Sequence, residues 1–186
     1  MIRYPAAVLL LAAGWIPAAN AQAGDNAAVL ALVRNAYALY ATGNDTGAAE
    51  VPMTARLKGA RDECSALQEK IEAADGDDSS FGACSEDYDV FCQCQDLGGV
   101  QWAKILIQTR FPAPGRGEAL IDFQHDGQPD LKLLLAKTPK GWEVDDFWEY
   151  AQAADGSEGS YRKRVTASIQ EMRAKLKLPA WKEPGL

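Results

Sequence analysis

Three carboxylates near the end of the chain have the spacing that best suits acid–base chemistry. Asp145, Asp146 and Glu149 lie close together in a strand-like segment, and paired carboxylates perform such chemistry in glycosidases. Strand alternation places Asp146 on the same side as Trp142 and Trp148, where a carboxylate must be paired or hydrogen-bonded. We therefore expect Asp146 to bind an arginine or a tyrosine in the core rather than to act in catalysis.

The single histidine and an aspartate-rich segment offer two further chemistries. His125 stands beside Asp126 in a predicted hairpin turn, and no nucleophile is near it, which favours an exposed turn residue over a general base. Residues 75–86 half resemble a calcium loop, but Ser80 occupies the position that requires glycine. We therefore expect no metal, no cofactor and no catalytic residue, and the chain is predicted not to be an enzyme.

Four cysteines, Cys64, Cys84, Cys92 and Cys94, indicate two disulfides in an oxidising compartment. Cys92 and Cys94 are too close in the sequence for a comfortable mutual bond. Each is therefore expected to reach Cys64 or Cys84, and two pairings stay open. A zinc site is disfavoured, because the spacing lacks the two-plus-two pattern of zinc ligands and no histidine is near.

The first 21 residues have the form of a secretory signal. An apolar run at 6–16 is followed by the small-residue cleavage site Ala19-Asn20-Ala21, and residues 21–23 provide an alternative site. The run is too short to span a membrane, and no later stretch is long enough. We therefore expect cleavage near Ala21, a periplasmic location, and a single domain over residues 22–186.

Length and net charge limit the classes of partner that the chain could bind. The chain has 186 residues and a net charge of −7, so a basic footprint for nucleic acid is excluded. Its length fits one domain. A homodimer is left open beside a monomer.

Periodicity predicts the elements that must position these residues. Apolar stripes indicate helices at Ala27–Ala41 and Thr54–Ala73, the second with Cys64 on its buried stripe, and Ser160 can cap a last helix. Four strand-like segments lie between them, at 102–111, 117–123, 130–137 and 142–150. Apolar and polar side chains alternate along these segments. The sequence therefore predicts an α+β fold with helices on one face of an antiparallel sheet.

The segment from Asp75 to Asp96 is the most distinctive feature, because all its charged side chains are acidic and aromatic residues are interleaved with them. Disulfides would hold the segment in one shape. A rigid loop with aromatic anchors and one sign of charge suits a basic protein partner. The alternative is that the aromatic rings enter the core and the acids only solubilise. The predicted partner-binding residues are Asp77, Asp78, Phe81, Glu86, Asp87, Tyr88 and Phe91.

A second hypothesis is a domain that binds a small molecule or a glycan. Trp142, Trp148 and Tyr37 would line its pocket, and Asp146 would be the polar group that orients the ligand.

Several short motifs resemble a bacterial family of periplasmic proteins and lipoproteins without assigned function, within the nuclear transport factor two-like superfamily. The motifs are Tyr37-x-x-Tyr40, Asp87-Tyr88-Asp89, Cys94-Gln95-Asp96, Gly141-Trp142-Glu143-Val144-Asp145-Asp146 and Ser160-Tyr161-Arg162. The resemblance implies a cone of helices on a curved antiparallel sheet. Some exported proteins that look like this chain are immunity proteins, which inhibit peptidoglycan amidases delivered by type VI secretion. The resemblance thus implies a basic secreted cell-wall hydrolase as the partner.

Overall fold

The computed structural model describes residues 18–42, 51–75, 84, 89, 91–92, 100–150 and 159–185. The elements are α1 (Ala18–Ala41), α2 (Ala55–Asp75), the short 3-10 helix η3 (Trp102–Lys104), β1 (Leu106–Ala113), β2 (Arg116–Asp122), β3 (Leu131–Thr138), β4 (Gly141–Glu149) and α4 (Tyr161–Lys175). All three predicted α-helices and all four predicted strands are present. Helix α1 begins earlier than the expected Ala27, and the start of the first predicted strand is η3.

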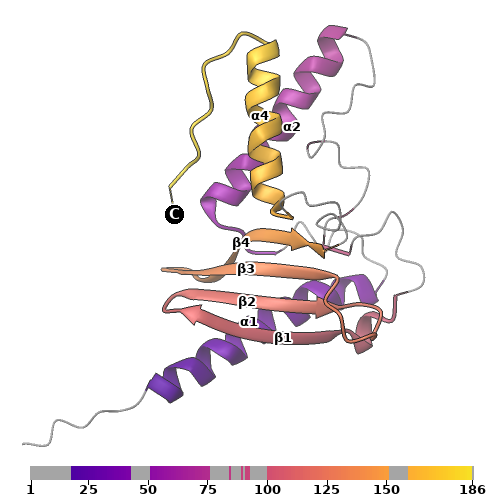
Figure 1. Cartoon of the computed structure of the whole chain (residues 1–186), viewed down its shortest axis with the longest axis vertical. Coiled ribbons are helices and arrows are strands. Elements are labelled where there is room, and N and C mark those ends of the chain that lie inside the picture. The colour runs from indigo at the N-terminus through magenta and orange to yellow at the C-terminus, as the bar shows by residue number, and fades with distance from the viewer. Residues whose placement is uncertain are drawn as a thin grey trace, which may run out of the picture.

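The four strands form one antiparallel sheet in the order β1-β2-β3-β4, which is curved and unclosed. The helices lie on one side of it, as Figure 1 shows: α1 runs behind the strands, while α2 and α4 lie side by side and extend away from the β4 edge. The predicted α+β fold with helices on one face of a curved antiparallel sheet is therefore confirmed.

The core lies between the sheet and the helices, where alternate strand residues are buried. Ile121 of β2 and Leu133 of β3 are almost fully buried, and α1 packs Val33 and Tyr37 into the same core. The stripe of α4 is buried as predicted, through Tyr161, Val165, Ile169 and Met172. The hydroxyl of Ser160 caps this helix by accepting a hydrogen bond from the amide of Lys163.

The alternation predicted for β4 is wrong beyond Val144, because the strand contains a β-bulge. Leu135 pairs with Val144 but Leu134 pairs with Asp146, so Asp145 is an extra residue on β4. An extra residue reverses which side chains point to each face. Phe147 therefore enters the core, and Trp148 lies on the opposite face.

The β4 edge of the sheet is covered by two short segments. Residues 52–54 form a parallel bridge with Val144, and Ser160 forms an antiparallel bridge with Trp148. These contacts protect the edge from pairing with other chains. They also bring the residues just before α2 and just before α4 to the same strand.

Among the described residues, no helix is both long and apolar enough to cross a membrane.

Candidate functional site

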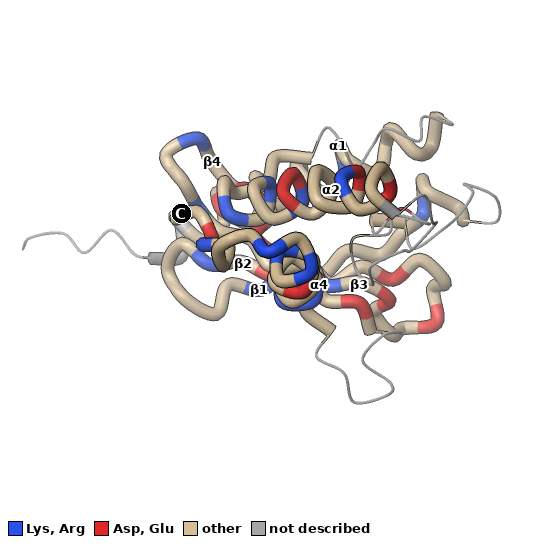
Figure 2. Tube along the Cα trace, turned by 90° about the horizontal axis from the view of Figure 1, so that it is seen from above, with Lys and Arg blue, Asp and Glu red and all other residues tan. Residues whose placement is uncertain are grey.

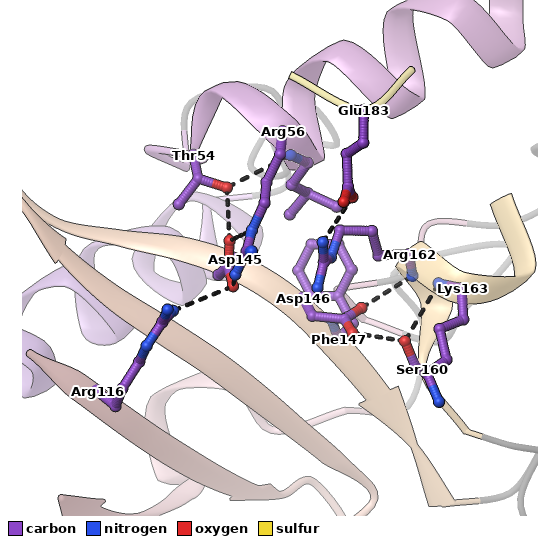
Figure 3. Close-up of polar contacts among 11 residues, drawn as sticks. Thr54, Arg56, Arg116, Asp145, Asp146, Phe147, Ser160, Arg162, Lys163 and Glu183 are labelled. Atoms are coloured by element: carbon purple, nitrogen blue, oxygen red, sulfur yellow. Dashed lines mark hydrogen bonds and ion pairs between the residues drawn. The ribbon is translucent and has the colours of Figure 1, made fainter. Parts of the chain in front are cut away.

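The bulge of β4 places Asp145 at the start of α2, where three side chains bind it (Figure 3). Asp145 accepts a hydrogen bond from the hydroxyl of Thr54 at 2.9 Å and forms a two-pronged ion pair with Arg56. Arg116 of β2 approaches the same carboxylate at 3.5 Å. Because Asp145 is only 5% exposed, these partners supply the charge and hydrogen bonds that a buried carboxylate needs.

Asp146 binds the start of α4 in the same way. Its carboxylate accepts hydrogen bonds from the hydroxyl of Ser160 at 2.5 Å and from the backbone amides of Phe147 and Arg162 at 2.8 Å each (Figure 3). Asp146 is hydrogen-bonded as predicted, but the prediction that its partner is an arginine or a tyrosine side chain is wrong. A negative charge at a helix N-terminus is also favourable to the helix dipole.

The three carboxylates considered for acid–base chemistry therefore hold elements of the fold together. Asp145 holds α2 and Asp146 holds α4, while Glu149 is 1% exposed and pairs with Arg164 of α4. Paired catalytic carboxylates must face a common space that admits a substrate. Asp145 and Asp146 instead bind the starts of two different helices, so their carboxylate oxygens are engaged by groups of the fold.

The pairing of Asp145 predicts a dependence of stability on pH. Burial opposes its ionisation, but hydrogen bonds from Arg56 and Thr54 outweigh burial and hold its pKa below the ordinary value of 3.8. As the pH drops through that value, the unfolded chain binds more protons than the folded chain. The free energy of unfolding therefore decreases as the pH is lowered. We expect the urea midpoint to fall as the pH drops below about 4. The variant Asp145→Asn should show a smaller fall, and an equal fall would contradict this role.

The first disulfide joins Cys64 of α2 to Cys84, with 5.4 Å between their Cα atoms. Cys64 lies on the buried stripe of α2, as predicted. Cys92 is also disulfide-bonded, and Cys94 lies outside the described residues. Since Cys64 and Cys84 pair with each other, the expectation that Cys92 and Cys94 each reach one of them is wrong. Which cysteines pair depends on their distance in space, which their separation along the chain does not set.

Two tyrosines of α1 bind the acidic segment. The hydroxyl of Tyr40 donates a hydrogen bond to the carboxylate of Asp89 at 2.5 Å, and that of Tyr37 donates to the carbonyl of Phe91 at 2.8 Å. Asp89 also accepts a hydrogen bond from the amide of Phe91. Burial, with nearby Tyr40 and Asp89, raises the pKa of Tyr37 well above 10.0, so its hydroxyl remains a donor.

Phe91 is not the surface anchor that the sequence analysis expected. Its side chain is fully buried and packs edge-on against Phe147, with 4.6 Å between ring centroids. The burial of Phe91 agrees with the alternative in which the aromatic rings of the segment enter the core. The other predicted partner-binding residues lie outside the described residues: Asp77, Asp78, Phe81, Glu86, Asp87 and Tyr88.

The pocket predicted for a small molecule or a glycan is not assembled. Tyr37 stacks on Trp102 inside the core, and Trp142 lies near the start of α1, where its indole donates to Asp25. Trp148 lies on the other face of the sheet, next to Lys132. The three aromatic residues therefore line no common space.

The histidine has the position predicted for it. His125 is exposed in the turn between β2 and β3, and its amide donates a hydrogen bond to Asp122. Within the described ranges, no group of three or more histidine, cysteine, aspartate or glutamate residues could hold a metal ion. Most of the segment that half resembles a calcium loop lies outside those ranges.

Sequence reasoning missed two of the residues that organise this region. Arg56 follows Thr54 by two residues, but nothing local shows that it faces a strand far along the chain. Asp89 was counted as one more acid of the acidic segment, although it binds Tyr40. The helical spacing of Tyr37 and Tyr40 places both hydroxyls on one face of the helix. This spacing was the one signal in the sequence that the two tyrosines could bind the same segment.

The fold is thus a curved antiparallel sheet with helices on one side and buried carboxylates at the helix starts. No protein-family model, curated protein or solved structure matches the chain.

Proposed function

We propose that this chain is an exported, non-catalytic binding protein whose acidic segment, residues 75–96, docks on a basic protein. In the finer form of the proposal, the partner is a secreted peptidoglycan amidase and the chain is its periplasmic immunity protein. The nuclear transport factor two-like resemblance of the motifs supports this form.

The observation that carries the proposal is the way the segment is attached to the core. Cys84 is bonded to α2, Asp89 is bound by Tyr40, and Phe91 is buried. These attachments fix the positions of Cys84, Asp89 and Phe91 before any partner arrives. A segment whose attachment points are already fixed loses less entropy on binding.

The charge of the chain supports a basic partner. The net charge is −7, and the segment itself carries only acidic charges. Acidic positions also gather at the end of the sheet beside the β3 label in Figure 2. Asp122 ends β2, and Asp126 and Asp130 follow it before β3 begins. Such a field speeds the approach of a cationic protein and disfavours an anionic one.

Export is part of the proposal and agrees with the disulfide. Disulfides persist in oxidising compartments such as the periplasm. Cleavage after Ala21 would remove the first four residues of α1, Ala18 to Ala21, and would leave the core residues of the helix in place.

The decisive experiment measures partner binding with and without the Cys64–Cys84 bond. The natively exported protein would first capture its partner from the periplasm, in a strain that carries a cell-wall hydrolase gene next to the gene for this chain. We expect the double variant Cys64→Ser/Cys84→Ser to remain folded and to bind at least about tenfold more weakly, because the segment must then be ordered on binding.

Circular dichroism at the binding temperature checks that this double variant is folded. A matched control is Tyr150→Phe, which changes the residue that follows β4 and should leave the affinity for the partner unchanged. Equal affinity of the folded double variant and the wild type would refute the proposed role of the segment. Capture of an acidic partner would refute the charge argument.

A further inference from the structure

The sheet face that the helices leave uncovered carries a depression of about 200 Å³. Thr109 of β1 is bound to Asn26 of α1, so the odd-numbered residues of β1 face the helices. The even-numbered residues Leu106, Gln108 and Arg110 therefore project to the opposite face. Together with Leu120 of β2, they line the depression.

The depression has a buried apolar side chain at its floor and partly exposed apolar side chains around it. Leu120, opposite Gln108 in the sheet register, is 8% exposed. Leu106 and Tyr150 are among the large hydrophobic side chains that remain exposed, at 47% and 36%. Pro129 from the turn between β2 and β3 completes the lining. An apolar floor with a few polar groups around it is the usual composition of a ligand site.

The polar groups around this floor are available to a ligand. In the part of the chain that the structure describes, the side chains of Gln108 and Arg110 and the hydroxyl of Tyr150 have no hydrogen-bond or ion-pair partner. Burial and the charge of Glu118 raise the pKa of Tyr150, so its hydroxyl stays a donor.

Asp122, the acidic residue of the lining, is already engaged. Its two carboxylate oxygens accept hydrogen bonds from the backbone amides of Gln124, His125 and Gly127. The free groups of the depression are therefore mainly donors, and the guanidinium of Arg110 is the one cation among the lining residues.

We propose that this depression binds a small carboxylate with a short apolar chain. Arg110 and Gln108 would hold the carboxylate, since a guanidinium matches both of its oxygens, and the apolar chain would lie on Leu120. A volume of about 200 Å³ corresponds to roughly seven water molecules at about 30 Å³ each. That volume is below the range of drug-sized sites and suits one amino-acid residue.

The carboxylate could belong to a free amino acid or to the C-terminus of a peptide. Glu118 is the register partner of Arg110, and it would favour the ammonium group that only the free amino acid carries beside its carboxylate. This site is separate from the acidic segment, so the test of carboxylate binding is independent of the proposed immunity function.

The test is a titration of the full, oxidised chain followed by amide NMR shifts and calorimetry. The probes are leucine, N-acetyl-leucine as a mimic of a peptide C-terminus, and leucinamide, which lacks the carboxylate. We expect one or both carboxylates to bind saturably and to shift the amides of β1 and β2, whereas leucinamide does not. The tighter of the two carboxylates identifies the source.

Variants place the binding at the depression. Arg110→Gln should weaken the carboxylate at least about tenfold, as expected for the loss of a charged hydrogen-bonding partner. The matched control Arg34→Gln changes an exposed arginine of α1 and should leave the affinity unchanged. Absence of saturable binding, shifts confined to another surface, or unchanged affinity of the Arg110→Gln variant would each overturn the proposal.

Discussion

Replacing Asp145 by asparagine is expected to lower the free energy of unfolding by about 3 kcal/mol. Asparagine keeps the shape of the side chain but removes the charge that binds Arg56, whose own side chain is only 19% exposed. Removing one partner of a buried ion pair leaves the other charge poorly solvated, which is the costly case. Arg56 is not fully buried and can partly recover water, which puts the loss near the lower end of the usual range.

Asp62→Asn is the matched control, because it makes the same chemical change in an exposed ion pair. Lys58 and Asp62 are 66% and 62% exposed, and exposed pairs contribute between about 0 and 1 kcal/mol. Urea unfolding at pH 7, followed by circular dichroism with the disulfides intact, measures both variants. Similar losses in the two variants would show that Asp145 does not hold α2 to the sheet.

Replacing Phe91 by alanine is expected to cost about 3–5 kcal/mol of stability. The ring is fully buried against Phe147, and its removal leaves a cavity beside the sheet that neighbouring groups can fill only in part. The backbone carbonyl that accepts from Tyr37 is unchanged by the substitution, so the loss reports the ring alone.

Leu106→Ala serves as the control for Phe91→Ala. Leu106 is 47% exposed on the uncovered sheet face, so its truncation should change stability by less than about 1 kcal/mol. If Phe91→Ala were as mild as Leu106→Ala, the attachment of the acidic segment through Phe91 would be wrong. The acidic segment would then lack one of the points that support its proposed rigidity.

Several features of the fold could be predicted from local patterns. The stripe of Leu57, Cys64 and Ile71 predicted a buried helix face, and the strand segments predicted an antiparallel sheet. Ser160 was recognisable as a cap because a serine before an apolar helical stripe satisfies free backbone amides. These features depend on residues close to one another in the chain, so their periods and caps are readable without tertiary contacts.

The candidate site was harder to predict, because its residues meet only across the fold. The position of Asp146 depends on a bulge created by pairing with β3, and one extra residue reverses both faces of the strand. The Cys64–Cys84 bond depends on where the segment after α2 lies in space. The depression at Arg110 needs residues from β1 and β2, from the turn between β2 and β3, and from Tyr150 after β4.

Local patterns in the amino-acid sequence were enough to predict the helices, the strands, the α+β class and the acidic character of residues 75–96. Three features became visible in the folded chain alone. Asp145 and Asp146 bind the starts of helices, Phe91 is buried in the core, and unpaired donors gather on the sheet face that the helices leave uncovered. The difference lies in the separation along the chain over which each interaction acts. Propensity and periodicity depend on a few neighbouring residues, whereas ion pairs, disulfides and strand register depend on contacts between distant parts of the chain.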